Sequence, residues 1–219
     1  MKMARSADRR IRAQGITAAI SRRRCIGRLD GITDSERYGL RSIGATAGEA
    51  AATTGRLLAG LLVIPGIWIF QGVLPEDADI PCVPHVVSAG RRTLLIESVT
   101  WPAGRYHVTR DSRIRCDGTY TGQSLRTLIA TLAYWRQRLP ADQRVGAVIV
   151  VHPIDPGPLE LPGPATPDIV WTSGDEAVGV IAPFLSRERT QVSLTVLTAL
   201  AAATDRRRAH EARIDGDIR

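Results

Sequence analysis

Cysteine is scarce in this chain of 219 residues. The three cysteines, Cys25, Cys82 and Cys116, form no C-x-x-C pair, and their odd number leaves at least one without a disulfide partner. A disulfide-stabilised scaffold and a zinc ribbon are therefore both disfavoured. Because disulfides are rare in reducing compartments, this cysteine usage favours a cytoplasmic protein.

Long apolar runs are also missing. The most apolar stretch, 57–70, has 14 residues and contains Gly60, Pro65 and Gly66. A helix needs about 20 apolar residues to span a bilayer, so we expect no membrane span. We interpret the stretch as a helix end, a turn and a buried strand. The N-terminus carries arginines where a secretory signal needs an apolar segment, so no signal peptide is expected.

Lysine is nearly absent, since 28 of the 29 basic residues are arginine and the exception is Lys2. Residues 1–29 carry nine basic side chains and one acidic one, whereas the rest of the chain has 20 basic and 21 acidic groups. We therefore expect a loosely attached, Arg-rich arm over 1–33 that contacts nucleic-acid phosphates. Its candidate binding residues are Arg9, Arg10, Arg12, Arg22, Arg23 and Arg24.

Strong catalytic motifs are missing as well. The chain has neither a Gly-x-x-x-x-Gly-Lys phosphate loop nor a Gly-x-Ser-x-Gly nucleophile elbow. Cys82 and Cys116 have no accompanying histidine and acid that would mark a nucleophile. His152 has no cysteine or carboxylate at metal-ligand spacing, which favours a structural role for it.

What the sequence does contain is a series of apolar patterns that predict a mixed α/β protein. Helical spacing predicts helices over 46–62, 123–139, 177–185 and 191–203. Apolar and β-branched runs predict strands over 67–70, 83–89, 93–99 and 145–151, and shorter ones over 105–109, 113–116 and 168–171. We expect one domain over 34–188, followed by a C-terminal helix and charged tail over 189–219.

The order of certain motifs points to a family. Gly48-Glu49 opens the first helix, a strand containing Trp68 follows, and His85-Val86-Val87 then precedes a glycine turn and Leu94-Leu95-Ile96-Glu97. This order resembles the nuclease-related domain (NERD), a branch of the PD-(D/E)XK restriction-endonuclease-like superfamily. The similarity covers roughly 44–186. It implies a mixed central sheet flanked by helices, and hydrolysis of phosphodiester bonds with Mg²⁺.

The resemblance also implies four catalytic groups, of which two are missing. NERD proteins supply a helix Glu, a strand Asp, and an acid two residues before a Lys on the next strand. The carboxylates hold the metal ion and the lysine stabilises charge. Glu49 and Glu97 match the two acids, whereas Pro84 stands at the Asp position and Val99 at the Lys position.

Substitutes for the missing groups are few. Asp79 and Asp77 lie five or more residues upstream of Pro84, so a metal site built from Asp79 and Glu97 requires a rearranged loop. Arg126 could offer positive charge, but an arginine does not exchange protons. A salt bridge from Glu97 to Arg91, Arg92 or Arg126 is the simpler expectation, because a carboxylate after an apolar run must be paired.

Other side chains have both structural and functional interpretations. Trp101 and Tyr106 could stack on a base, but packing at the edge of the sheet is favoured. His85 matches a family position, yet a hydrogen-bonded histidine at the start of a strand is the commoner case.

Three functions remain open. The first is a non-catalytic nuclease-like domain that acts as a binding or interaction module, with nucleic acid contacted through the arm. The second is a Mg²⁺-dependent deoxyribonuclease with a rearranged site built from Glu49, Asp79 and Glu97. The third is a protein–protein interaction module. The loss of two catalytic groups favours the first, in which no cofactor is required.

Overall fold

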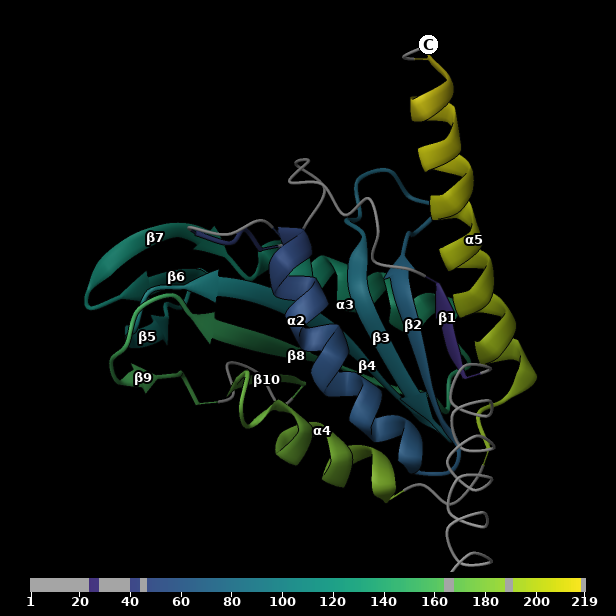
Figure 1. Ribbon diagram of the computed structural model, residues 1–219, viewed down its shortest axis with the longest axis horizontal. Coiled ribbons are helices and arrows are strands. Elements are labelled where there is room, and N and C mark those ends of the chain that lie inside the picture. The colour runs from purple at the N-terminus through teal and green to yellow at the C-terminus, as the bar shows by residue number, and fades with distance from the viewer. Residues whose placement is uncertain (1–23, 28–39, 44–46, 164–167, 188–190, 218–219) are drawn as a thin grey trace, which may run out of the picture.

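The computed structural model describes residues 24–27, 40–43, 47–163, 168–187 and 191–217, with side chains up to Arg206. These residues form an α/β protein built around a six-stranded mixed sheet of order β1-β2-β3-β4-β8-β10 (Figure 1). Strands β2, β3 and β4 form an antiparallel meander, while β8 runs parallel to β4, β10 to β8 and β1 to β2. The strands are β1 Cys25–Gly27, β2 Ile67–Val73, β3 Val83–Ala89, β4 Arg92–Trp101, β8 Arg144–Pro153 and β10 Ile169–Ser173.

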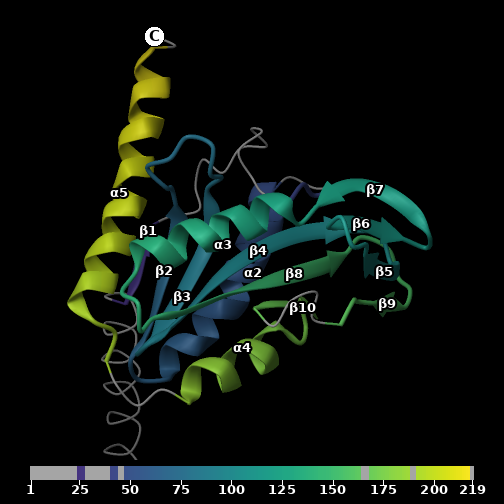
Figure 2. The ribbon, with the colours of Figure 1, turned by 180° about the vertical axis from the view of Figure 1, so that it is seen from behind.

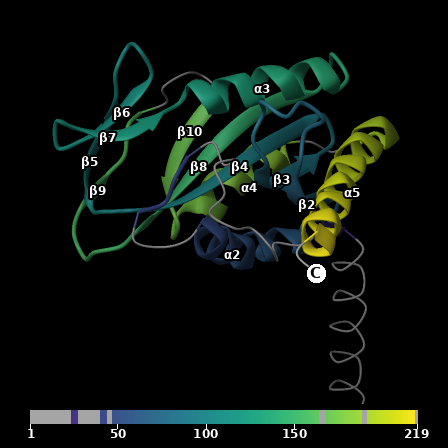
Figure 3. The ribbon, with the colours of Figure 1, turned by 90° about the horizontal axis from the view of Figure 1, so that it is seen from above.

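Helices cover both faces of this sheet, and each face has its own apolar cluster. One face packs against α2 (Ala47–Leu58), the 3-10 helix η1 (Ala59–Val63) and α4 (Ala177–Ser186). The other packs against α3 (Arg126–Arg138) and α5 (Leu194–Asp217). We call these the α2 face and the α3 face. Seen from above, α3 lies on one side of the sheet and α2 with α4 on the other (Figure 3).

Alternation along β4 shows how the two clusters share one strand. Leu95 and Val99 belong to the cluster on the α3 face, and Ile96 belongs to the cluster on the α2 face. Successive side chains of a strand point to opposite sides, so residues two apart share a face. The same alternation assigns a face to each of the remaining β4 side chains.

The stretch 57–70 folds as its sequence predicts. Helix α2 has Glu49 in its first turn and Arg56 in its last, which suits the helix dipole. The chain continues through η1, turns at Pro65 and Gly66, and enters β2. In the described part of the chain, no helix combines the length and apolarity that a bilayer crossing requires.

The strand predicted over 145–151 is confirmed as a central strand. Val145 to Val151 are all buried in β8, between β4 and β10. An uninterrupted apolar run is expected where both faces of a parallel strand pair are covered by helices. Figure 2 shows α3 lying across the sheet on the side opposite α2.

A second, smaller sheet projects from one end of the molecule (Figure 1). It has the order β7-β6-β5-β9, from β5 (Gly104–Val108), β6 (Arg113–Cys116), β7 (Thr119–Ser124) and β9 (Leu159–Glu160). The sequence predicts β5 and β6 but not β7. It also predicts a helix from residue 123, whereas α3 begins at Arg126 because Gln123 and Ser124 still belong to β7.

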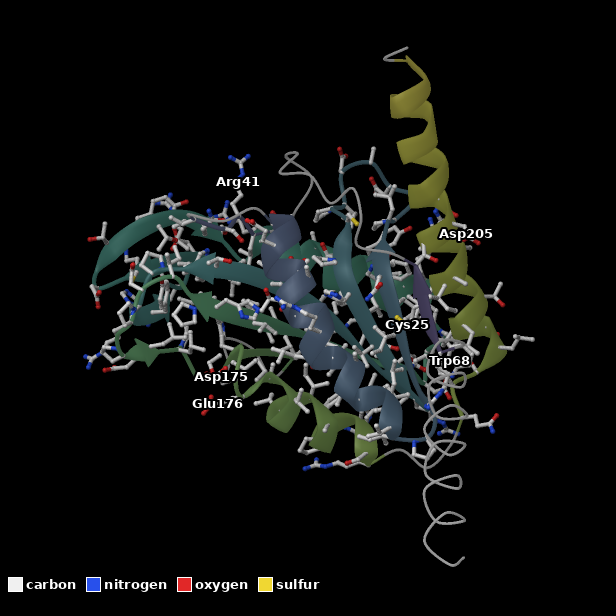
Figure 4. All side chains as sticks on the ribbon, viewed as in Figure 1. Cys25, Arg41, Trp68, Asp175, Glu176 and Asp205 are labelled. Carbon is white, nitrogen blue, oxygen red and sulfur yellow. The ribbon has the colours of Figure 1, made fainter. Side chains whose placement is uncertain are left out.

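The C-terminal helix is longer than predicted and belongs to the core. Val196, Leu200 and Ala203 of α5 are buried in the cluster of the α3 face, against β2. In Figure 4, Trp68 of β2 and Cys25 of β1 lie beside this helix. Its backbone continues to Asp217, through residues that we expected to form a charged tail.

The predicted arm over 1–33 is wrong at residues 24–27. Strand β1 pairs with β2 from Cys25↔Ile69 to Gly27↔Gln71, and Gly27 is needed there because a Cβ would run into the Gln71 carbonyl oxygen. The Arg24 guanidinium donates hydrogen bonds to the carbonyl oxygens of Leu62, Ile64 and Ile67. Arg24 therefore closes the end of η1 instead of belonging to a free basic segment.

Replacing Arg24 with alanine should lower the free energy of unfolding by about 2 kcal/mol, because three carbonyl acceptors would lose a charged donor. Thermal and urea unfolding would measure the loss. The matched control is Arg56→Ala, which removes an exposed guanidinium whose hydrogen-bond partner among the described residues is Thr53, one turn earlier. Equal stability of the two variants would contradict a structural role for Arg24.

Candidate functional site

Glu97 is buried inside the protein and lies on the α3 face. It is two residues from both Leu95 and Val99 and pairs in register with Ile149, all of which belong to the α3-face cluster. Only 1% of Glu97 is exposed, and its Oε1 has no hydrogen-bond partner among the described residues. Burial raises the pKa of this carboxyl from 4.5 to about 8.

The salt bridge expected for Glu97 is not formed by the described residues. Arg91 instead pairs with Asp142 at 3.3 Å, and Arg92 lies over the Phe184 ring with its Cζ 4.7 Å from the ring centroid. A buried carboxyl without a cation loses less free energy as the neutral acid than as the anion. Glu97 is therefore protonated at neutral pH.

Glu49, the other acid of the resemblance, lies on the opposite side of the sheet. It is an exposed residue in the first turn of α2, and α2 packs against the α2 face. Glu97 points to the α3 face, so the sheet separates the two carboxyl groups. The structure does not bring together the two acids that the sequence suggests as catalytic.

The remaining family positions do not complete a metal site. Pro84 is buried in β3 and Val99 is buried in β4. Asp77 and Asp79 are exposed in the loop before β3, and the Asp79 amide donates a hydrogen bond to Asp77 Oδ1. Mg²⁺ prefers several oxygen ligands around one point. No group of three or more His, Cys, Asp or Glu able to hold a metal occurs among the described residues. The residues present do not fit a catalytic Mg²⁺.

His85 is fully buried, and the hydrogen bond expected for it is not formed with any described residue. It pairs in register with Gln71 and Ile96, which places its ring on the α2 face, opposite the side chain of Glu97. Both ring nitrogens lack partners among the described residues. Desolvation lowers the pKa of His85 to about 3, so the imidazole is neutral.

His152 connects the end of β8 to α2. Its Nε2 is 2.8 Å from Thr54 Oγ1, a hydrogen bond between residues far apart in sequence. Gly174 leaves space for the ring, since a Cβ there would come within 2.5 Å of His152 Nδ1. Burial lowers the pKa of His152, which keeps the ring neutral for this contact. Its position agrees with the structural role favoured from the sequence.

The aromatic residues form a buried cluster where β4 meets the small sheet. Trp101 stacks on Tyr106 with ring centroids 5.3 Å apart, and the Trp171 ring centroid lies 6.0 Å from that of Trp101. Trp101 Nε1 donates to the Arg41 carbonyl, and the Tyr106 hydroxyl donates to the Pro102 carbonyl. Because Trp101 and Tyr106 are only 1% and 3% exposed, neither ring face is open to a base.

The remaining candidates are the arginines of the basic arm. Arg9, Arg10, Arg12, Arg22 and Arg23 lie outside the described residues. Arg24 is the one candidate that the structure describes, and its guanidinium is committed to backbone carbonyls of η1 and β2. The nucleic-acid contact expected for the other five stays a prediction.

A cavity lined by three arginines is not indicated by any sequence motif. Arg92, Arg136 and Arg144 line it together with apolar residues of β8, β10 and α4. The available signal was that Arg92 and Arg144 each stand just before an apolar run, Leu94 to Ile96 and Val145 to Val151. Their pairing across β4 and β8 depends on the strand register, which single-strand patterns do not contain.

Comparison of the chain with protein-family models, with curated proteins and with solved structures finds no match in any of the three.

Proposed function

We propose that the chain is a nuclease-related domain that has lost catalysis and acts as a binding or interaction module. The observation that carries the proposal is the burial of Glu97 in the α3-face cluster, with Val99 beside it and Glu49 across the sheet. A carboxyl that is neutral at pH 7 and shielded from water is a poor ligand for a hydrated divalent cation.

The element order supports the nuclease-related part of the proposal. Helix α2 is followed by the meander β2-β3-β4, then by the three short strands β5, β6 and β7, by α3 and by β8 parallel to β4. Within the main sheet and its helices, this is the order of helix, three strands, helix and strand on which the resemblance rests. Glu49, His85 and Glu97 also fall on the expected elements, namely α2, β3 and β4.

The proposed binding activity rests on charge. Seven basic residues and one acidic residue precede Arg24, and Arg24 is attached to the main sheet. A basic segment joined to a folded body can bind nucleic-acid phosphates by releasing counterions. In this proposal the folded domain positions the basic segment, and the arginines of the segment supply the affinity for nucleic acid.

The first test is nuclease activity. Purified protein, incubated with plasmid and with single-stranded DNA in Mg²⁺ or Mn²⁺, should leave both substrates intact. Loss of even one preorganised stabilising group typically costs about 10²–10³ in rate, and here two family groups are replaced. The Glu97→Gln variant serves as the matched control. Nicking by the wild type that disappears in Glu97→Gln would overturn the proposal in favour of a metal-dependent deoxyribonuclease.

The second test is binding. We expect the full chain to bind duplex or single-stranded nucleic acid with a steep salt dependence, and deletion of residues 1–23 to abolish that binding. Strand β1 begins after the deleted segment, so the sheet keeps all its strands. A control in which the seven basic residues of 1–23 become glutamine separates charge from chain length. Salt-independent binding, or none, would leave a protein–protein module as the better description.

A further inference from the structure

The small sheet that projects from the body has one face turned to the core and one turned to solvent (Figure 1). Tyr106 of β5 and Ile114 of β6 point to the core, since both belong to the apolar cluster of the α3 face. Their neighbours along each strand point the other way, because side chains alternate along a strand. We call the solvent side the outer face of the small sheet. Its exposed side chains are Arg105, His107, Arg113, Arg115 and Tyr120.

Strand register places these side chains next to one another. His107 pairs with Arg115, and Arg115 pairs with Tyr120, so the three form a row across β5, β6 and β7. Residues directly opposite each other on paired strands have their side chains on the same face. Arg113 lies over the Tyr120 ring, with its Cζ 5.6 Å from the ring centroid. The Tyr120 ring therefore lies among arginines on an exposed strand surface.

Part of this charge and part of this ring are available to a ligand. Arg115 donates a hydrogen bond to the Gly118 carbonyl, but it forms no ion pair with a described residue. Arg113, by contrast, pairs with Asp111 at 2.8 Å. Tyr120 is 47% exposed, so part of its ring surface is free to stack against another planar group. The outer face therefore offers a positive charge directly beside an exposed aromatic ring.

Acidic residues lie toward the other edge of the small sheet, where β5 pairs with β9. Asp117, Asp155 and Glu160 line a hollow of about 720 Å³ there, together with Arg105 and His107. The Arg105 guanidinium pairs with Glu160, and the Arg105 amide donates to Asp117 Oδ1 at 3.0 Å. An anionic ligand is repelled from this edge and attracted to β6 and β7.

We propose that the outer face of the small sheet binds single-stranded nucleic acid along β6 and β7, with a base stacked on Tyr120 and a neighbouring phosphate on Arg115. Stacking on a protein ring needs an unpaired base, because the bases of a duplex are stacked on one another. The inference rests on the proposed function for most of the affinity, which the basic segment before Arg24 supplies. The outer face adds a preference for unpaired bases, which that segment does not provide.

A nucleic acid suits this surface better than an acidic protein segment does. Carboxylates and phosphates both pair with guanidinium groups, so Arg115 alone does not distinguish them. An exposed aromatic ring does, because every base has a planar face that stacks on it whereas a carboxylate has none. Arg113 over the Tyr120 ring adds a cation–π contact that holds the ring in place.

The test is titration of the full chain with a labelled oligothymidine of about 20 nucleotides and with a duplex of equal length, followed by fluorescence anisotropy. Tyr120→Leu should weaken oligothymidine binding by about tenfold and leave duplex binding unchanged, because loss of one stacked base costs a factor of this order. The matched control is Tyr120→Phe, which keeps the ring and should bind both ligands as the wild type does.

The phosphate contact is tested by salt dependence. Arg115→Gln should lower the slope of log K against log salt for oligothymidine by about 0.7, the value for one phosphate on a single strand. The matched control is Arg56→Gln, which removes the same charge from an exposed position of α2, away from the small sheet (Figure 1). That variant should keep the wild-type slope. Circular dichroism of each variant verifies that the fold is unchanged.

Photo-cross-linking of the unmodified protein to an iodouracil-containing oligonucleotide locates the base without any substitution, and the adduct should form on Tyr120. Oligothymidine binding that requires residues 1–23 but is unchanged in Tyr120→Leu, with no adduct on β7, would overturn this inference and leave the proposed function standing. Absence of oligothymidine binding by the full chain would overturn both. Competition by an oligoglutamate peptide as strong as by unlabelled oligothymidine would overturn the inference in favour of an acidic protein partner.

Discussion

The Val99→Lys variant, which restores the lysine of the nuclease pattern, is expected to lose about 4 kcal/mol or more of unfolding free energy and to gain no nuclease activity. Val99 is fully buried in the α3-face cluster. An ammonium group there must either lose its proton or pull water into the core. Its neighbour Glu97 cannot offset this cost without losing its own proton in the same apolar layer.

Chemical denaturation at pH 7 measures this effect, and Val99→Met is the matched control. Methionine has nearly the length of lysine without the charge, so it reports the overpacking cost alone, about 1–3 kcal/mol. The difference between the two variants isolates the buried charge. A Val99→Lys protein that melts like the wild type and nicks plasmid with Mg²⁺ would show that Val99 faces a solvated site.

The second large effect concerns Glu97 and pH. Since burial raises the pKa of Glu97 to about 8 from 4.5, the folded state holds a proton that the unfolded state releases between these values. The stabilising contribution of the neutral acid is complete below about pH 4.5 and is lost as the pH rises through 8. Glu97→Gln should therefore stabilise the protein by on the order of 4 kcal/mol at pH 9 and hardly at all at pH 4.

Unfolding curves of both proteins from pH 4 to pH 9 provide the measurement. Glu176→Gln is the matched control, because it neutralises an exposed glutamate at the start of α4. That variant should follow the wild-type pH dependence. A wild-type stability that rises between pH 5 and pH 8, as for a paired carboxylate, would contradict the buried neutral acid.

At lower pH, His85 makes the free energy of unfolding rise with pH, which is the opposite of the effect of Glu97. Its pKa falls to about 3 from 6.5 on burial, so its contribution is present above pH 6.5 and is lost as the pH falls through 3. The two groups together predict greatest stability between about pH 4.5 and 6.5, where their slopes cancel. The two residues lie on opposite faces of the sheet, so each contributes its pH dependence without contacting the other.

Much of the main sheet was predictable from apolar patterning. The strands 83–89 and 145–151 and the helix that begins at Ala47 are long enough for periodicity to define them. Strand β1 was not predictable, because three residues directly after an arginine run carry no period. Its pairing with β2 depends on Arg24 and Gly27, whose partners lie about 40 residues away in sequence.

The small sheet and α5 were harder for different reasons. Strand β7 contains Thr, Tyr, Gly, Gln and Ser, with no apolar alternation, and none of its residues is buried. Helix α5 continues past residue 203 through charged residues, so its outer half carries no apolar stripe that would have signalled it.

The candidate site could have been predicted better than it was. Glu97 lies two residues from Leu95 and from Val99, and strand alternation alone puts all three on one side. That side follows an apolar pattern, which indicates a buried acid. What no pattern could reveal was the position of α2 on the other face, because the packing of helices on a sheet depends on the whole topology.

The charge state of Glu97 tests the central claim most directly. Carbon-13 NMR of the Glu97 side-chain carboxyl, titrated with and without Mg²⁺, should show a pKa near 8 that Mg²⁺ does not change. A pKa at or below its ordinary value, or a carboxyl resonance that shifts with Mg²⁺ at pH 7, would contradict the account and restore Glu97 as a metal ligand.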